Sequence, residues 1–415
     1  MSKEVEKPID YKLPKIRIDE NMDDTIFFNF VTGGISVEVH GYSEKTYTVV
    51  FTDEISGKVH GTFENVKAGE FRTVNPEYYI QWNIKVVDES NDETIKNYTL
   101  DLKGKTVLIT YESSALGDTL AWMPYIDEFR KKHECKVICS SFYNELFAEI
   151  YPEIQYIPRG QPLQGVHVSY KLGWFGSGHA NDKNPYDCHT IPLQKVATDI
   201  LGLEYSEIRP ELKLPKNKEK KMFNKGKYVV ITTSSTAQFK YWNNHGGWQN
   251  LVDWLVAKGY SVVNIGKQPN FLKNVHDFTG KRDFFELMNV IKYSEFFVGI
   301  TTGPCWYSWA IGKKTVFISG ITEAFCDFRS ECYRVENKEV CHGCFNDPKE
   351  TFDKGDWMYC PRNKGTKDHF ICTKEIKPDM VKETIKQVEK DLLENKSHMA
   401  MTDVECTEYL ASMGQ

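Results

Sequence analysis

The stretch TVLITYESSALGDTLAWMPYIDEFRKKH, residues 106–133, decides the expected fold of this chain. Its first seven residues, TVLITYE, have the apolar and β-branched character of a strand, and the run from residue 120 to 133 has the pattern of a helix. The polar segment SSALGDT separates the two. A strand followed by a loop and a helix is the repeating unit of a parallel sheet, so the sequence predicts an α/β fold.

Strand and helix patterns continue to alternate downstream. A first group has strands at 135–140, 154–158 and 167–174 and helices at 142–152 and 191–203. A lysine-rich run at 209–227, which we interpret as a linker, precedes a second group with strands at 228–236, 261–267, 295–300 and 314–320 and helices at 246–260, 283–294 and 304–312. The pattern predicts two Rossmann-like domains, 105–225 and 226–335, with a ligand cleft at the carboxyl ends of their strands.

The remaining segments differ in character from these two domains. Short alternating segments with turn residues between them predict an all-β module over residues 22–104. The other expected parts are a flexible N-terminus at 1–21, a cysteine-containing finger at 336–376, an amphipathic helix at 377–396 and a flexible tail at 397–415.

Charge and hydropathy exclude several classes of function. A net charge of −6 and a pI near 6.1 argue against a nucleic-acid binder that neutralises phosphates. The charged first 20 residues contain no apolar core of a signal peptide, and no later run approaches the roughly 18 apolar residues of a membrane span. We therefore expect a cytoplasmic protein without a membrane span, in which the 11 cysteines stay reduced.

The loop of the first βα unit carries a candidate acid or base. Gly117 is expected to allow a sharp turn, and Asp118 then lies beside the positive end of the helix, at the mouth of the cleft. A carboxylate at this position can accept a proton from an attacking hydroxyl. The alternative is that Asp118 only caps the helix, which is a common use of aspartate at a helix start.

The loop TTSSTAQFKYWNNHGGW, residues 232–248, carries candidate donor-binding groups in the second domain. The ammonium group of Lys240 is expected to offset the negative charge of a departing diphosphate, and Trp242 to offer a flat face to a sugar or base. Thr236, Asn243 and Asn244 supply hydroxyl and amide groups for the same donor. The alternative is an exposed loop with a solvated lysine and a tryptophan that packs in the core.

A second candidate phosphate site lies in GITTGPCWYSWA, residues 299–310. Here a strand ends at Thr302 and Gly303, and Pro304 begins a helix whose free backbone N–H groups suit a diphosphate. A helix start without a ligand has the same pattern. The segment has no Walker lysine and no complete Gly-x-Gly-x-x-Gly motif, so the sequence argues against a hydride-transferring enzyme.

Four cysteines lie close together near the C-terminus. Cys341 and Cys344 are separated by two residues, Cys344 and Cys360 by 15, and Cys360 and Cys372 by 11. This spacing is compatible with a tetrahedral site that holds zinc or iron, although only the first pair has knuckle spacing. The polar sequence between the cysteines cannot form its own core, so we expect a structural metal here rather than unliganded thiols. A closed shell of four thiolates leaves no open position for catalysis.

Several of these motifs together resemble the bacterial autotransporter heptosyltransferases, the TibC-type family, and more distantly the lipopolysaccharide heptosyltransferases of the same GT-B clan. The resemblance spans roughly residues 22 to 390 and is most specific where KYWNN occurs together with the cysteine finger. The motifs that carry it are LGDTLAWMPY, AQFKYWNNHGGW, DFTGK, GITTGPCWYSWA, VFISGIT, CHGCFND, YCPRN and FICT.

The resemblance implies a GT-B glycosyltransferase with an N-terminal β-barrel-like module. Such an enzyme transfers heptose from ADP-heptose to serine hydroxyls of an autotransporter passenger by inverting displacement, and assembles into a large symmetric homo-oligomer. By this resemblance Asp118 is the general base and Lys240 stabilises the ADP leaving group. The donor site is then lined by Gly117, Thr236, Trp242, Asn243, Asn244, Thr302, Gly303 and Pro304.

The family's iron-binding finger matches Cys341, Cys344, Cys360 and Cys372, which favours iron, with zinc as the alternative. Pro304 and the C-terminal segment TDVECTEYLASMGQ depart from the family pattern, and the second departure leaves Cys406 without a role. Two other functions stay open at this point: transfer to a lipopolysaccharide core sugar, and a non-enzymatic binding protein that uses the finger for recognition.

Overall fold

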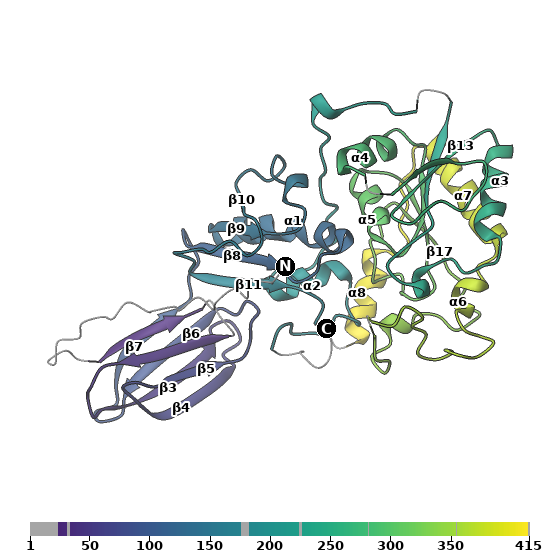
Figure 1. The fold of residues 1–415 in the computed structure, drawn as a ribbon. Helices are drawn as coiled ribbons and strands as arrows, with labels where there is room; N and C mark the ends of the chain where they lie inside the picture. Colours follow the sequence, from purple (N-terminus) through teal and green to yellow (C-terminus); the bar gives the residue numbers. More distant parts are fainter. Residues whose placement is uncertain are drawn as a thin grey trace, which may run out of the picture. The chain divides into compact units, whose positions relative to one another are not determined.

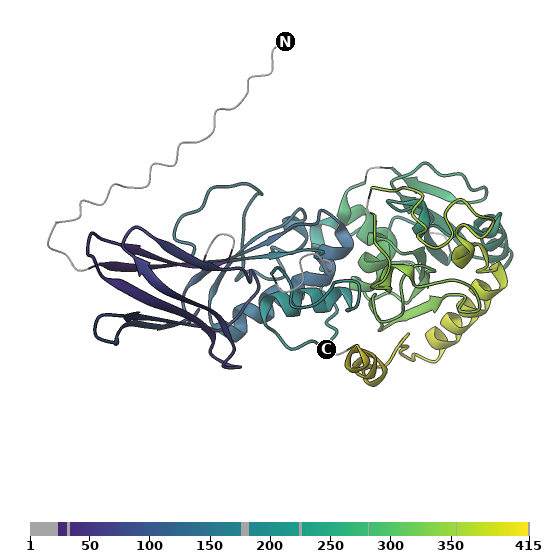
Figure 2. The ribbon, with the colours of Figure 1, turned by 90° about the horizontal axis from the view of Figure 1, so that it is seen from below.

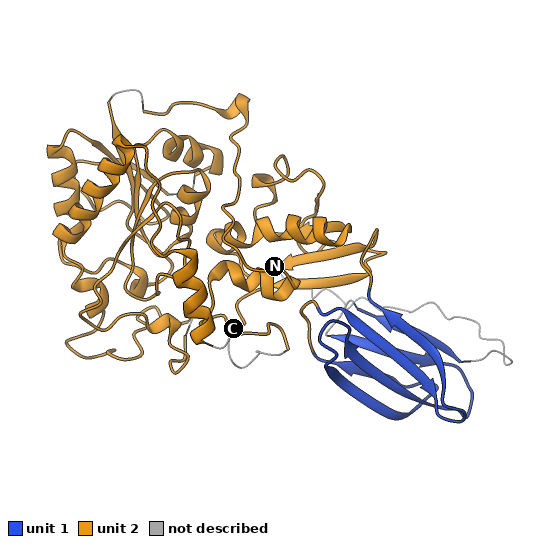
Figure 3. Cartoon of the chain, turned by 180° about the vertical axis from the view of Figure 1, so that it is seen from behind, with its two compact units in different colours: residues 1–75, 80–100 blue, residues 76–79, 101–415 orange. Residues whose placement is uncertain are grey.

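We describe the protein from a computed structural model, over residues 24–30, 34–175, 182–223, 226–280, 282–353 and 355–413 (Figure 1). The chain forms two compact units. Unit 1 comprises Met1–Asn75 and Ile80–Leu100, and unit 2 comprises Pro76–Tyr79 and Asp101–Gln415 (Figure 3). None of the helices in the described part of the chain is long and apolar enough to cross a membrane.

The described part of unit 1 forms two antiparallel sheets and contains no helix, as predicted for the all-β module. One sheet has the order β1-β2-β5 and the other the order β4-β3-β6-β7. Alternate side chains of β3 and β6, such as Phe51 and Trp82, are buried between neighbours, as expected for strands with one buried face. The strands are β1 (Thr25–Asn29), β2 (Ile35–His40), β3 (Thr46–Asp53), β4 (Val59–Lys67), β5 (Phe71–Val74), β6 (Trp82–Asp88) and β7 (Glu93–Thr99).

The expectation of a β-barrel-like module is wrong, because the described strands form two separate sheets. No described strand of one sheet pairs with a strand of the other, so the hydrogen-bonded ladder does not close on itself. The module is therefore a pair of sheets rather than a barrel.

The first Rossmann-like domain of unit 2 contains a parallel sheet of order β10-β9-β8-β11. The predicted helix at 142–152 is replaced by turns and a 3-10 helix, η1 (Asn144–Leu146), because the side chain of Asn144 accepts from Ser141 and donates to the carbonyl of Ile157. The other elements agree with prediction: β8 (Thr106–Tyr111), α1 (Leu116–His133), β9 (Lys136–Ser140), β10 (Gln155–Tyr156), β11 (Val168–Leu172) and α2 (Leu193–Leu201).

The second domain contains a parallel sheet of order β14-β13-β12-β15-β16-β17. Its central strands are buried on both faces, which explains their continuous apolar sequences. Its edge strands β14 and β17 were not predicted. The elements are β12 (Tyr228–Thr232), α3 (Gly247–Ala257), β13 (Ser261–Gly266), β14 (His276–Thr279), α4 (Phe284–Lys292), β15 (Phe297–Ile300), α5 (Gly303–Ala310), β16 (Thr315–Ile318) and β17 (Cys332–Val335).

Two helices cover one face of this sheet. Side chains of α3 and of α7 (Pro378–Leu393) form one core with alternate residues of the central strands, among them Val298 and Ile300. The residue between these two, Gly299, faces α5 instead, since a Cβ there would lie 2.5 Å from the sulfur of Cys305. Over its described residues, the predicted lysine-rich linker between the domains is largely irregular, with one 3-10 turn, η3 (Lys216–Lys218) (Figure 1).

The expectation of a flexible tail at 397–415 is wrong over most of its length. Residues Asp403–Ser412 form the helix α8, which lies apart from α7 at the end of the chain (Figure 2). Thr402 and Glu405 form a capping box at its start, and the ring of Tyr409 stacks on Phe325 with centroids 4.1 Å apart. Cys406 is 2% exposed, so its role is to pack this helix against the domain.

Candidate active site

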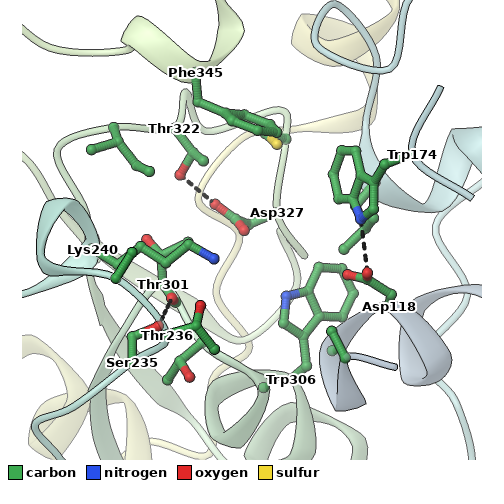
Figure 4. A pocket seen from close by; sticks show the side chains of 18 of the residues that line it. Asp118, Trp174, Ser235, Thr236, Lys240, Thr301, Trp306, Thr322, Asp327 and Phe345 are labelled. Atoms are coloured by element: carbon green, nitrogen blue, oxygen red, sulfur yellow. Dashed lines mark hydrogen bonds between the residues drawn. The ribbon is translucent and has the colours of Figure 1, made fainter. Parts of the chain in front are cut away.

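A cavity of about 520 Å³ lies within unit 2, where the carboxyl ends of both parallel sheets meet. In each sheet the order of strands reverses beside the first strand, between β8 and β11 and between β12 and β15. Loops that follow these four strands supply most of the cavity wall, which is the position expected for a ligand in an open α/β sheet. The cleft predicted from the sequence is therefore present, and Figure 4 shows its side chains.

Asp118 lies in this cavity, in the first turn of α1, and is 8% exposed. Its Oδ2 atom accepts a hydrogen bond from Nε1 of Trp174 over 2.7 Å (Figure 4). The residue at the N-cap of α1 is Ala115, and no side chain caps the helix there. The alternative that Asp118 serves as the helix cap is thus wrong, and its carboxylate points into the cavity.

Gly117 has a different role from the sharp turn expected. It lies inside α1, and a Cβ atom there would be 3.2 Å from the Trp306 ring and 3.5 Å from Cα of Gly303. A Cβ atom at Gly303 would lie 3.2 Å from Cβ of Leu116 and 3.3 Å from the backbone nitrogen of Gly117. The two glycines let the first turns of α1 and α5 touch, and this contact joins the two domains at the base of the cavity.

Lys240 reaches the cavity from the second domain. It ends a 3-10 helix, η4 (Gln238–Lys240), in the loop after β12, and its ammonium group points into the cavity from the side opposite Asp118 (Figure 4). Thr236 lines the same wall, and Oγ of Ser235 donates to the carbonyl of Thr301 over 3.1 Å. This bond ties the loop after β12 to the loop after β15.

Three donor-binding candidates from the loop at residues 232–248 do not line this cavity. Trp242 is 3% exposed, and its Nε1 donates to the carbonyl of Ile376 within the core over 2.8 Å. Asn243 donates to Thr373 and Asn244 to the carbonyl of Lys374, so both amides hold the end of the finger. For Trp242 the alternative given by the sequence, a tryptophan that packs in the core, is the correct one.

The helix start at residues 302–304 agrees with the sequence prediction. Thr302 is at the N-cap of α5 without a side-chain capping bond, and Pro304 lies in the first turn. Thr302 and Gly303 line the cavity, whereas Pro304 does not. The partial positive charge of this helix start therefore faces the cavity, which suits an anionic group such as a diphosphate.

A polar chain that the sequence did not reveal runs along one wall of the cavity. Thr322 donates to Asp327 over 2.7 Å (Figure 4), and Arg334 donates to the same carboxylate oxygen over 3.1 Å. Ser319 connects Thr322 to Thr301, with distances of 2.8 and 3.1 Å. Asp327 lies in an irregular segment after β16, where no periodic pattern marks it.

The loop before α2 adds an oriented imidazole. Nδ1 of His189 lies 2.7 Å from Oδ1 of Asp187, and His189 lines the cavity. The described chain has one group of three potential metal ligands whose ligand atoms all lie within 4.8 Å of one another, formed by Asp187, Cys188 and His189. Because Asp187 binds both the ring and the backbone N–H of His189, the simplest role of the carboxylate is to fix the imidazole.

The finger brings the four predicted cysteine ligands into one region. Cys344, Cys360 and Cys372 belong to a single packed cluster, and burial, followed by the nearby Cys360 and Cys341 thiols, raises the pKa of Cys372 to about 12. Gly343 has a φ of +65°, which allows the tight turn between Cys341 and Cys344. Among described residues, no three of these sulfur atoms lie within 4.8 Å of one another. The four cysteines therefore lie in one region, but their sulfur atoms are further apart than the ligand atoms of a single metal site.

Two buried thiols at the cavity are not suited to nucleophilic chemistry. Burial raises the pKa of Cys326, which lines the cavity, well above its usual value, and does the same for Cys305 beneath it. Both thiols therefore stay protonated, and the other ionisable residues that line the cavity in the described part of the chain are Asp118, Cys188, His189, Lys240 and Asp327.

Comparison with known proteins agrees with this geometry. Residues 164–325 match the model of glycosyltransferase family 9 (heptosyltransferase). The chain is 31% identical over 336 residues to the autotransporter heptosyltransferase TibC of Escherichia coli O78:H11 (strain H10407 / ETEC), which is 78% of this chain and 81% of TibC. It is also 31% identical over 377 residues to the autotransporter heptosyltransferase Aah of Escherichia coli, covering 88% of this chain and 92% of Aah.

A solved structure extends the similarity to the fold. The crystal structure of dodecameric iron-containing heptosyltransferase TibC in complex with ADP-D-beta-D-heptose matches with a TM-score of 0.81 and 29% sequence identity. The match covers 88% of this chain and 96% of that one. The α/β glycosyltransferase fold predicted from the sequence is thus confirmed.

Proposed function

This chain belongs to the autotransporter heptosyltransferases, and from that premise we propose that it transfers heptose from ADP-heptose to serine hydroxyls of an autotransporter passenger protein. The similarity to TibC, which has been solved with ADP-D-beta-D-heptose, supports the donor. The names of TibC and Aah support an autotransporter as the acceptor.

The observation that carries the proposal is the pair formed by Asp118 and Lys240. The carboxylate comes from the first domain and the ammonium group from the second, and both point into one cavity (Figure 4). A displacement at a sugar carbon needs a base on the side of the attacking hydroxyl and positive charge on the side of the leaving group. The opposite placement of these two groups supports that division of roles.

In the proposed reaction, Asp118 accepts the proton of a serine hydroxyl while the serine oxygen attacks C1 of the heptose. The bond between C1 and the β-phosphate oxygen breaks as the new C1–O bond forms on the opposite face, so the configuration at C1 inverts. The proton ends on Asp118 and the electron pair on the departing ADP. Trp174 donates to Asp118 and supports the orientation of the carboxylate.

The departing diphosphate gains negative charge in this step. Lys240 and the backbone N–H groups at the start of α5 are the proposed partners of that charge, because both face the cavity. Thr236 and Ser235 add hydroxyl groups on the same wall. Catalysis thus relies on positioned charge and needs no metal ion at the reacting atoms.

We further propose that Cys341, Cys344, Cys360 and Cys372 hold iron, as TibC is iron-containing. The donor set fits by chemistry, since thiols suit iron or zinc: Cys344, Cys360 and Cys372 belong to one packed cluster, and the thiol of Cys341 is near that of Cys372. The ion would act as a structural crosslink of the finger. By the same similarity we propose a large symmetric homo-oligomer, since TibC is dodecameric.

The test uses the purified full-length protein with ADP-heptose and a passenger fragment, followed by intact-mass spectrometry. We expect additions of one heptose residue per modified serine, located by peptide mapping, with the anomeric configuration read by NMR. Asp118→Asn keeps the side-chain size and should lower kcat/KM by about 10²–10⁴-fold while ADP still raises the melting temperature.

Two outcomes would contradict the proposal. One is no added mass under conditions in which TibC modifies its own passenger in parallel. The other is transfer by Asp118→Asn at the parent rate, which would leave Asp118 without a catalytic role. Retention of configuration at C1 would exclude only the inverting displacement, and heptose transfer itself would stand.

A further inference from the structure

The 3-10 helix η5 (Cys344–Asn346) of the finger reaches into the cavity and contacts both domains. The ring of Phe345 packs edge-to-face on Trp174, with centroids 5.5 Å apart and an interplanar angle of 83°. Phe345 also packs on His189 at 5.1 Å. Both of these partners belong to the first domain, although the finger follows the second domain in sequence.

Asn346 bonds the same turn to both domains. It is 5% exposed, so its amide is shielded from water. Its Oδ1 accepts from the backbone N–H of Glu323 in the second domain over 2.8 Å, and its Nδ2 donates to the carbonyl of His189 in the first over 2.7 Å. A buried amide with both ends satisfied fixes the position of η5 relative to the two domains.

Trp174 has two aromatic neighbours. Its ring packs on Trp122, with centroids 6.3 Å apart, and Trp122 is anchored by its own bond to the carbonyl of Leu193. The ring of Trp174 also packs on Phe345 (Figure 4). With both contacts in place, the indole N–H of Trp174 donates to Asp118.

We propose that η5 positions the catalytic carboxylate: Phe345 holds Trp174 in the orientation in which its indole N–H aims Asp118 at the acceptor hydroxyl. Phe345 and Trp174 are therefore positioning residues, and the finger acts on the reaction through them. This inference rests on the proposed function, because it assigns a support to the base of that reaction.

Several charged groups surround Asp118 and stay in place in the test. Lys240, His189 and Asp327 line the same cavity, and the hydroxyl of Tyr143 is near enough for the charge of Asp118 to contribute to its raised pKa, after burial and Glu145. A substitution of Trp174 or Phe345 removes none of these groups, but Phe345 also packs on His189, so Phe345→Leu alters the surroundings of that imidazole. A change in the pH profile is therefore assigned to the contact between Trp174 and Asp118 only where Trp174→Phe, which leaves Phe345 and His189 in place, shows it as well.

The experiment measures kcat/KM against pH for Trp174→Phe, which removes the N–H, and Phe345→Leu, which removes the aromatic edge. We expect the acid limb of the Trp174→Phe profile to move up by about one pH unit, because a hydrogen bond to the charged carboxylate is lost. Phe345→Leu should move it the same way by less, and Phe345→Tyr, which keeps the ring, should retain the parent profile. ADP affinity and metal content should stay at parent values.

Matched controls come from aromatic pairs outside the cavity. Trp309→Phe removes a buried indole bond to Oγ of Ser330, 3.0 Å long, and Phe317→Leu removes a buried edge-to-face pair with Phe328. Both should leave the acid limb unchanged. A second readout does not depend on activity: in a crystal structure of Phe345→Leu, we expect Trp174 to turn away and its 2.7 Å bond to Asp118 to lengthen.

The inference is overturned if Phe345→Leu keeps both the parent pH profile and the Trp174–Asp118 bond. It is also overturned if the two controls shift the acid limb as far as Trp174→Phe does. Failure of the proposed function would look different, because the parent protein itself would then transfer no heptose; that outcome overturns both.

Discussion

Replacing Gly303 with alanine tests whether the contact between α1 and α5 sets the geometry of the cavity. The new Cβ atom would lie 3.2 Å from Cβ of Leu116 and 3.3 Å from the nitrogen of Gly117, both tighter than an ordinary van der Waals contact. One neighbour is backbone, so the two helix starts must separate by a few tenths of an ångström. Asp118 lies one residue after Gly117, and the separation therefore moves it away from the proposed diphosphate site.

The expected effects on stability and on activity differ in size. Alanine in place of glycine stabilises a helix by up to about 1 kcal/mol, while overpacking costs about 1–3 kcal/mol, so we expect a net loss of about 1 kcal/mol. A misplacement of 1 Å at a reacting centre costs on the order of 10²-fold in rate, and a few tenths of that distance should cost about tenfold. A tenfold loss in kcat/KM corresponds to about 1.4 kcal/mol of transition-state stabilisation.

The assay combines kcat/KM for heptose transfer with the melting temperature of the same preparation. Gly247→Ala is the matched control, because Gly247 also begins a helix, and a Cβ there would meet the core ring of Trp242 at 2.9 Å. This control should lose stability and keep its activity per folded molecule. The reasoning is refuted if Gly303→Ala has the parent kcat/KM, or if Gly247→Ala loses as much activity.

Three further predictions concern stability and the finger. Burial, followed by the charge of Lys132, lowers the pKa of His133 from 6.5 to about 4. The native state therefore binds this proton only at a lower pH than the unfolded state does. The free energy of unfolding should fall by up to about 3 kcal/mol as the pH drops from 6.5 to 4. In denaturant melts across this range, His133→Leu should remove that slope, and an unchanged slope would contradict it. Ending the chain at Met401 deletes α8 and removes the Thr402 and Asp403 partners of Arg329, which is 1% exposed. We expect the free energy of unfolding, measured by calorimetry, to fall by about 2–4 kcal/mol. An unchanged melting temperature would show that α8 does not contribute to stability. Cys341→Ser should lower the iron or zinc content per chain by elemental analysis and destabilise the finger, whereas a native preparation without either metal would exclude the ligand assignment.

The strands and helices that carry the site could be predicted because their signal is local. The patterns at 106–133 and 228–260 predict a strand, a loop and a helix each, and in a parallel sheet such loops meet at one edge. Lys240 lies in one of those loops and Asp118 in the first helical turn after the other, so their convergence on one cavity follows from the topology. The edge strand β14 gave no such signal, since its side chains are exposed or only partly buried and its sequence is not apolar.

The direction of each loop side chain could not be predicted in the same way. Trp242 lies two residues after Lys240 but turns into the core, where its partner is the carbonyl of Ile376, 134 residues further along the chain. Trp174 and Phe345 meet although neither lies near the other in sequence. The C-terminal helix α8 likewise depends on contacts to Phe325 and Arg329 rather than on a strong pattern of its own.

Hydrophobic periodicity, a property of neighbouring residues, was enough to determine two parallel sheets and the segments at their carboxyl ends that carry Asp118 and Lys240. Only the tertiary structure decided which side chains complete the cavity, that the finger forms part of its wall, and that two glycines bring the domains into contact. The physical reason is that a side chain in a loop takes its direction from the packing and hydrogen-bond partners it finds across the fold, and those partners are distant in sequence.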